Sequence, residues 1–239
     1  EQHDPEICQG GFMNAEEYCE MVERQHRLRM QRISTMPIHD DGSPLVSLLE
    51  SGFDLVFEPS VMKNYRYLVR SAVRDKIGRI SALLSAMKKR LVIRSAWRSF
   101  EHQQLLWVRN LEVARGQNPD KSPDEIERIT MEFTAPREKS MHSTGGAEEH
   151  KIFDVEKNCV MDFATNHGFK LDLNTKCNPL HQGISPEAKK NRSLLMDLFD
   201  DEDFVCDQTE YWHFDYGNVM WALEKGKDHS IFGIVKDAH

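Results

Sequence analysis

The chain has 239 residues, of which 39% are hydrophobic, so it is long enough to bury one full core as a single large domain. Its formal net charge of -8 argues against nucleic acid as a partner, because a phosphate backbone is bound by a clustered basic surface. No uninterrupted apolar run approaches the roughly 20 residues that cross a bilayer. These features predict one compact domain without a membrane span.

The first residue is Glu1 rather than Met, which we interpret as a trimmed chain or a mature form whose signal peptide has been removed. We therefore expect a periplasmic or secreted protein, with the cytoplasm as the alternative. The cysteines follow no CxxC pattern, which argues against a cysteine zinc knuckle. Disulfides and free thiols both stay open, because connectivity does not follow from sequence. The cysteines are Cys8, Cys19, Cys159, Cys177 and Cys206.

The N-terminal segment begins with a helix signal. Asn14 and Glu17 have the spacing of a capping box, which predicts a helix over residues 14–31. A loop containing glycine and proline follows it. We therefore divide the chain into an N-terminal helical arm and loop, residues 1–55, and one main domain, residues 56–239.

The next segments predict a helix, a strand and a second helix. An amphipathic pattern over residues 60–89 predicts a long helix with one apolar face toward the core. Residues 91–93 are apolar and β-branched in part, as in a short buried strand. Ser99 is placed to cap a helix over residues 101–114. Arg98 therefore lies at a junction between strand and helix.

Two later helices begin at serine–proline pairs. Ser122 is followed by proline and then by Glu125, which combines a capping box with proline at the first helical position and predicts a helix to about Phe133. A second pair at Ser185 opens another helix. Short extended pieces fill the rest of the last third, and no internal repeat is present. The pattern is that of an α+β protein with a single domain.

Two histidines stand in unusual surroundings. His142 is followed by Gly145 and Gly146, which would let the backbone turn tightly and pass close to an ion, and Glu149 could return a carboxylate to the same point. His213 has Glu210 three residues before it. On a straight strand a spacing of three places side chains on opposite faces, so both reach one site only if the chain bends there.

These residues carry a family resemblance. The chain reads S-M-H-S-T-G-G-A-E-E from Ser140 and E-Y-W-H from Glu210. It resembles the VanX-type D-Ala-D-Ala dipeptidases and the VanY-type carboxypeptidases, whose pattern is S-x-H-x-x-G-x-A-x-D followed by E-x-W-H. The segment S-A-W-R-S around Arg98 is similar to the G-Y-R segment of that family. The resemblance covers roughly the second half of the chain through several separated motifs.

The resemblance implies a fold and a mechanism. The fold would be an α+β domain with a central antiparallel sheet, flanked by helices, with zinc in a cleft. One Zn²⁺ per chain would be held by two imidazoles and one carboxylate, with a small peptide as the substrate and the oligomeric state left open. The implied ligands are His142, Glu149 and His213.

Other residues would act on the substrate. By the resemblance Glu210 would be the general base that activates a metal-bound water, and Arg98 would polarise the scissile carbonyl. Ser140 and Trp212 would contact the substrate. The physical chemistry agrees, since a permanently charged guanidinium stabilises a developing oxyanion.

Two departures from the family pattern stand out. Glu149 replaces the aspartate ligand of the family, and His150 and Asp154 are rival third ligands if the register slips. Gly168 stands where the family has an aspartate that recognises the free amino group of the substrate. Loss of that carboxylate weakens the case for strict dipeptide selectivity, although Asp162 or Asp172 could substitute.

Three functions therefore compete. The first is zinc-dependent hydrolysis of D-Ala-D-Ala or a related cell-wall dipeptide that contains D-amino acids. The second is a carboxypeptidase or endopeptidase that acts on longer peptidoglycan-type peptides. The third is a degenerate, noncatalytic binding protein on the same scaffold, for which the altered third ligand is the motive.

Overall fold

The structure is a computed structural model that describes residues 15–131, 134–165 and 176–238. The helices of this part are α1 (Ala15–Ile33), α2 (Ser71–Ala86), α3 (Phe100–Gln117), α4 (Pro123–Met131), α5 (Pro186–Asp200) and α6 (Val219–Glu224), with a 3₁₀ turn, η1 (Met141–Thr144). The strands are β1 (Leu45–Ser47), β2 (Leu55–Phe57), β3 (Leu68–Arg70), β4 (Lys89–Ser95), β5 (Ala147–Asp154), β6 (Cys159–Val160), β7 (Val205–Cys206) and β8 (His213–Asp215).

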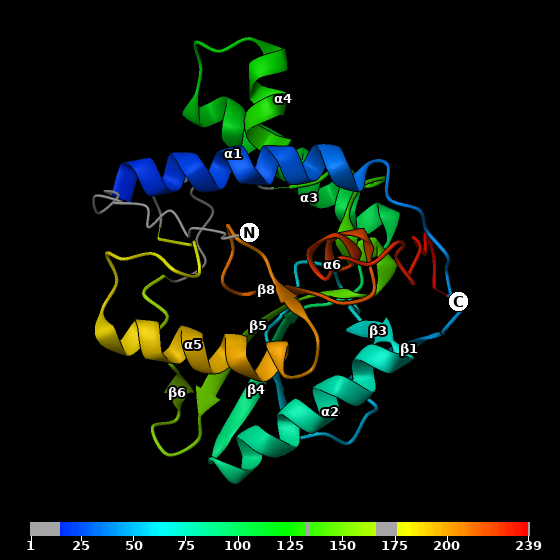
Figure 1. Ribbon diagram of the computed structural model, residues 1–239, viewed down its shortest axis with the longest axis vertical. Helices are drawn as coiled ribbons and strands as arrows, with labels where there is room; N and C mark the ends of the chain where they lie inside the picture. Colours follow the sequence, from blue (N-terminus) through cyan, green and yellow to red (C-terminus); the bar gives the residue numbers. More distant parts are fainter. Residues whose placement is uncertain (1–14, 132–133, 166–175, 239) are drawn as a thin grey trace, which may run out of the picture.

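The central sheet has the strand order β2-β4-β5-β8-β7, and β6 pairs with the far end of β5. Every pairing is antiparallel except that of β2 with β4, which is parallel. β1 and β3 form a separate two-stranded sheet. The expected α+β architecture with a largely antiparallel sheet flanked by helices is confirmed (Figure 1).

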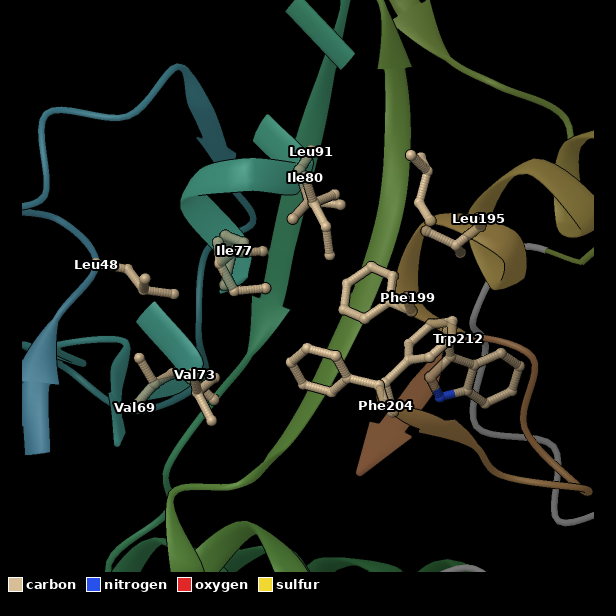
Figure 2. Close-up of a cluster of buried hydrophobic side chains, with 14 of the residues drawn as sticks. Leu48, Val69, Val73, Ile77, Ile80, Leu91, Leu195, Phe199, Phe204 and Trp212 are labelled. Carbon is tan, nitrogen blue, oxygen red and sulfur yellow. The ribbon is translucent and has the colours of Figure 1, made fainter. Parts of the chain in front are cut away.

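One apolar core lies between the sheet and two helices. Ile77 and Ile80 of α2 and Leu195 and Phe199 of α5 meet Leu91 of β4 over the same part of the sheet (Figure 2). All five side chains are fully buried, so the sheet face that carries them is closed to solvent. The functional side chains described below come from the opposite face of β4 and β5 and from the ends of strands.

The helix predicted over residues 60–89 is shorter than expected. It begins at Ser71, because the chain before it pairs with β1 as strand β3. Two residues just before that strand, Asn64 and Tyr67, have positive φ angles of 60° and 47°. Such left-handed positions end helical backbone, and the apolar pattern of this segment serves a strand instead.

The helix caps predicted at Ser99, Ser122 and Ser185 are confirmed, whereas Asn14 of the first predicted cap lies outside the described residues. Ser99 accepts a hydrogen bond from the backbone N–H of His102, and the oxygen of Ser185 accepts one from Ala188. Ser122 and Glu125 form the reciprocal bonds of a capping box, at 3.4 and 2.9 Å. Within the described residues no helix is long and apolar enough to cross a membrane.

The N-terminal helix is joined to the rest by contacts with α6. Ile33 packs with Val219 and Met220, and Arg29 forms an ion pair of 2.6 Å with Glu224.

Of the cysteines, Cys159, Cys177 and Cys206 lie in the described part and are free thiols. Cys8 lies outside the described residues, and the side chain of Cys19 is not described.

Candidate metal centre and active site

The sheet register brings the three predicted ligands together. Glu149 of β5 is paired directly with His213 of β8, and cross-strand partners share a face of the sheet. His142 lies on η1, just before β5. One donor atom from each of the three residues lies within 4.8 Å of the other two. His142 and His213 are 71 positions apart in the chain. They are neighbours because η1 leads directly into β5 and β5 is paired with β8.

The ring of His142 is held with one nitrogen free for a metal. Its Nδ1 lies 3.0 Å from the carbonyl oxygen of Ala96, which is the geometry of an N–H donating to that oxygen. Burial, reinforced by the positive charge of Arg98, lowers the pKa of His142 to about 3. The imidazole is therefore neutral at neutral pH, which is the form that binds a metal.

The glycines after His142 allow the tight turn that the sequence predicts. Gly145 has a φ of +75°, and a Cβ there would lie 2.4 Å from the side chain of Leu45. A Cβ on Gly146 would lie 2.1 Å from the carbonyl oxygen of Tyr216. Only glycine fits both positions, so η1 can turn directly into β5 and place His142 beside Glu149.

Glu149 is a buried carboxylate between two arginines. Its Oε1 bonds to the guanidinium of Arg98, its Oε2 lies 3.3 Å from Nη1 of Arg94, and Nε2 of His142 is 3.4 Å from Oε1. Burial alone would raise the pKa of Glu149, but Arg98 and then Arg94 outweigh it and hold the pKa well below its usual range. The side chain is therefore ionised, as a ligand must be.

The rival third ligands lie elsewhere. His150 points to the opposite face of β5, where its Nε2 lies 2.9 Å from Glu148. Asp154 lies at the far end of the strand, where it accepts a hydrogen bond from the backbone of Lys157. Among the described residues, the group of potential ligands that includes His142 and His213 contains Glu149 and neither rival.

His213 is oriented by a second carboxylate. Its Nε2 lies 3.3 Å from Oδ2 of Asp215, so Nδ1 is the nitrogen left to face the other two ligands. Burial opposes the charged form, but the Asp215 carboxylate outweighs it and raises the pKa of His213 to about 10. A metal that binds there displaces this proton.

Glu210 lies beside the ligands because the chain bends before β8. The backbone N–H of His213 donates to the carbonyl oxygen of Glu210 at 3.0 Å, which is the bend that a spacing of three requires. The carboxylate of Asp207 accepts the backbone N–H groups of Thr209 and Glu210, at 2.7 and 3.1 Å, and fixes the preceding turn. Burial, with the nearby charges of Glu149 and Asp207, raises the pKa of Glu210 to about 7.

Arg98 is held on both sides. Its Nε donates to Oγ of Ser95 at 3.0 Å, and its Nη1 lies 3.5 Å from the side-chain oxygen of Gln103. Its backbone N–H donates to the carbonyl oxygen of His142, and Ser143 Oγ donates back to the Arg98 carbonyl oxygen. The loop that carries the arginine and the loop that carries the first ligand are thus joined directly.

Two further segments lock the loop of His142. Arg70 is 3% exposed and donates to the carbonyl oxygen of Thr144 at 2.8 Å. The backbone N–H of Val235 donates to the carbonyl oxygen of Ser143 at 2.7 Å. The carbonyl oxygen of Val235 accepts a hydrogen bond from the indole N–H of Trp97 at 2.9 Å. The C-terminal segment therefore links the loops on either side of the site.

The predicted substrate contacts are both buried. Ser140 is 3% exposed and precedes η1. Trp212 is 8% exposed, packs edge-on against Tyr211 and lies in the apolar core (Figure 2). Their roles as substrate contacts stay predictions. Gly168 and Asp172 lie outside the described residues, and Asp162 lies in a turn in which it accepts a bond from Ala164.

Sequence reasoning missed three residues that support the site: Arg94, Asp207 and Asp215. The signal for Asp215 was available, because residues two apart on a strand share a face and Asp215 is two residues after His213. Arg94 and Asp207 carry no such signal, since each acts across a turn or a strand pairing that is visible only in the fold.

The donor set fits zinc. Two imidazole nitrogens and one carboxylate oxygen are the protein ligands of many catalytic zinc sites, which keep the fourth position for water. Nδ1 of His142 is engaged by Ala96 and Nε2 of His213 by Asp215, so the other nitrogen of each ring is free to bind the metal. An α+β fold with this centre, a half-buried glutamate and an arginine beside it defines a zinc metallopeptidase.

The family follows from comparison with known proteins. Residues 57–230 match the family model described as D-Ala-D-Ala dipeptidase, and the chain belongs to this family. No curated protein matches the chain at a significant level.

Several solved structures are similar. The LD-carboxypeptidase LdcB has 15% identity and a TM-score of 0.46, with 78% of this chain and 76% of that chain covered. A mutant of the vancomycin-resistance D,D-pentapeptidase VanY in complex with Zn(II) has 12% identity and a TM-score of 0.44, with 80% and 93% covered. VanYB in complex with D-alanine-D-alanine has 14% identity and a TM-score of 0.44, with 80% and 92% covered.

Proposed function

We propose that this chain hydrolyses D-Ala-D-Ala, or a related cell-wall dipeptide that contains D-amino acids, with zinc held by His142, Glu149 and His213. The convergence of these three side chains beside Glu210 is the observation that carries the proposal. Membership of the family described as D-Ala-D-Ala dipeptidase supports this choice of substrate. Such a substrate derives from the cell wall, so a periplasmic or secreted location forms part of the proposal.

Glu210 acts as the proton carrier. Zinc, when bound, supplies a Lewis acid that lowers the pKa of water and polarises a carbonyl. The Glu210 carboxylate takes the proton from the attacking water and delivers it to the leaving amine. A pKa of about 7 suits both steps, because the group can accept and release a proton near neutral pH.

Arg98 stabilises the charge that develops on the scissile carbonyl oxygen. Its guanidinium is held by Ser95 on one edge and pairs with Glu149 on the other. A fixed positive group in a half-buried site acts more strongly on a developing oxyanion than it would in water, and it needs no reorganisation. The same charge keeps Glu149 ionised.

The test compares two glutamates. Glu210→Ala is expected to lower D-alanine release from D-Ala-D-Ala by about 100-fold to 10,000-fold while zinc stays near one per chain. Glu202→Ala is the matched control, because Glu202 is paired with Arg79 on the surface and not with the metal ligands. Wild-type turnover by Glu210→Ala would exclude Glu210 as the base.

A second candidate function is cleavage of longer peptides. A cavity of about 300 Å³ lies along β5 and is lined by Lys151, Asp154, Cys159 and Asp162, and none of the three proposed metal ligands is among the described residues that line it. Lys151 is two residues from Glu149 on the same face of the strand. A longer substrate that extends from the centre along β5 would enter this cavity. Turnover of blocked and extended peptides, compared with turnover of D-Ala-D-Ala, separates the two functions. A preference for a free amino terminus excludes the second.

One zinc per chain with no turnover of any peptide would favour a noncatalytic binding protein.

A further inference from the structure

His213 can serve a metal only if its ring is held in one orientation. An imidazole has two nitrogens, and the hydrogen bond made by one of them decides which nitrogen is free. In this structure Nε2 of His213 faces Oδ2 of Asp215 at 3.3 Å. His213 and Asp215 share one face of β8, because they are two residues apart on the strand.

Asp215 is itself fixed by the next turn of the chain. It is 1% exposed, and its other oxygen, Oδ1, accepts a hydrogen bond of 2.6 Å from the side-chain nitrogen of Asn218. Asn218 is fully buried, and its own side-chain oxygen accepts the backbone N–H groups of Met220 and Trp221, at 3.0 and 3.1 Å. Both oxygens of Asp215 therefore have a defined partner.

These bonds form one chain of support from α6 to the metal centre. The cap of α6 fixes Asn218, Asn218 fixes one carboxylate oxygen of Asp215, and the other oxygen fixes the ring of His213. β8 is held in turn by its pairing with β5, which carries Glu149. The ring of His213 cannot rotate without breaking a contact of a fully buried group.

We propose that Asp215 is a positioning residue for the metal centre: it binds Nε2 of His213 and so presents Nδ1 to the ion. The proposal rests on the proposed function, since it takes His213 as a ligand. A carboxylate that accepts from the outer nitrogen of a ligand histidine also raises the basicity of the ligand, and loss of such a partner typically weakens metal binding about 10-fold to 100-fold.

A purely structural role for Asp215 makes a different prediction. In that case its removal would destabilise the fold without a specific effect on zinc affinity. The chain offers a matched control in Glu148, which is fully buried in the same sheet and lies 2.9 Å from Nε2 of His150. This carboxylate also holds an imidazole, but that imidazole is on the opposite face of β5 from Glu149.

The experiment measures zinc affinity by competition with a chromophoric chelator, together with the thermal midpoint of each metal-free protein. Asp215→Ala is expected to bind zinc about 10-fold to 100-fold more weakly than wild type. Asp215→Asn, which keeps an acceptor oxygen but loses the charge, and Asn218→Ala, which frees Asp215, are expected to show smaller losses in the same direction. Glu148→Gln is expected to lower the thermal midpoint and keep the zinc affinity.

The outcomes separate this proposal from the proposed function. If wild type binds zinc and His213→Ala loses it, but the Asp215 variants keep wild-type affinity, the positioning role is excluded and the function stands. Equal losses in Glu148→Gln and Asp215→Ala would also exclude it, because the effect would then be global. If wild type binds no zinc, or His213→Ala keeps wild-type affinity, both the positioning role of Asp215 and the proposed function are excluded. Should Asp215→Ala not fold, Asp215→Asn and Asn218→Ala decide the question.

Discussion

The two faces of strand β5 hold the same pair of residue types in opposite settings. On one face His142 lies 3.4 Å from Glu149, and on the other His150 lies 2.9 Å from Glu148. Glu149 is surrounded by Arg98, Arg94 and a second histidine, whereas the His150 ring lies among aromatic rings, 4.6 Å from that of Phe199. A glutamate and a histidine therefore make a metal site only where other ligands and charges converge on them.

Removal of each carboxylate in turn is expected to separate the two pairs most strongly. Glu149→Ala is expected to lose bound zinc and all detectable peptidase activity, because only two ligands remain. The loss of affinity should exceed the roughly 100-fold that removal of a supporting group causes. Elemental analysis and D-alanine release measure both effects. Retention of one zinc per chain by Glu149→Ala would remove Glu149 from the ligand set.

The core-facing pair should respond in stability instead. Glu148→Ala leaves His150 buried without its hydrogen-bond partner, and we expect a loss of about 1–3 kcal/mol in the free energy of unfolding. Urea denaturation of the metal-free protein measures it. The double variant Glu148→Met with His150→Phe should recover most of that loss, because apolar groups of similar volume replace a buried polar pair. A double variant as unstable as the single one would contradict this.

The charges around Glu149 give the next test. Arg98→Ala is expected to lower kcat by about 100-fold to 1,000-fold, the cost of removing one oxyanion donor, while zinc remains bound. Arg79→Ala is the control, because Arg79 forms a surface pair with Glu202. Loss of zinc together with activity in Arg98→Ala would show instead that the arginine acts mainly by holding Glu149.

The smallest effect is the pH dependence that Glu210 imposes. Burial raises the pKa of this carboxyl to about 7, and the base works only when ionised. Activity is therefore present above the pKa and falls about tenfold per pH unit below it. Bound zinc favours the carboxylate, so the midpoint should lie at or below about 7. A value of kcat/KM that stays constant well below this pH would exclude Glu210 as the base.

Local signals predicted much of this fold. The capping motifs at Ser122 and Ser185 open helices α4 and α5, and the apolar residues 91–93 lie in β4. The helix predicted from residue 60 was wrong at its start, because pairing of β3 with β1 overrides the apolar periodicity there. Short strands depend on partners distant in sequence, which periodicity does not reveal.

The three candidate metal ligands could be chosen from sequence motifs, whereas the residues that hold them in place could not. Glycines after His142 and the spacing to Glu149 signal a ligand loop, and the structure brings both beside His213. The choice of Glu149 over His150 depends on which face of β5 each side chain takes, and that is set by register against β4 and β8. Arg94 enters the site through the same register and has no local signature.

The link between Val235 and the loop of His142 has a consequence for biosynthesis. A chain emerges from the ribosome N-terminal end first, so His142 and Glu149 are exposed before His213 and well before Val235. The candidate centre is completed only when β8 pairs with β5, and the loop of His142 makes its bond to Val235 only after that segment has been made. The three candidate ligands can therefore hold a metal in their final arrangement only after the segment around Val235 has been made, so full metal binding follows the synthesis of that segment.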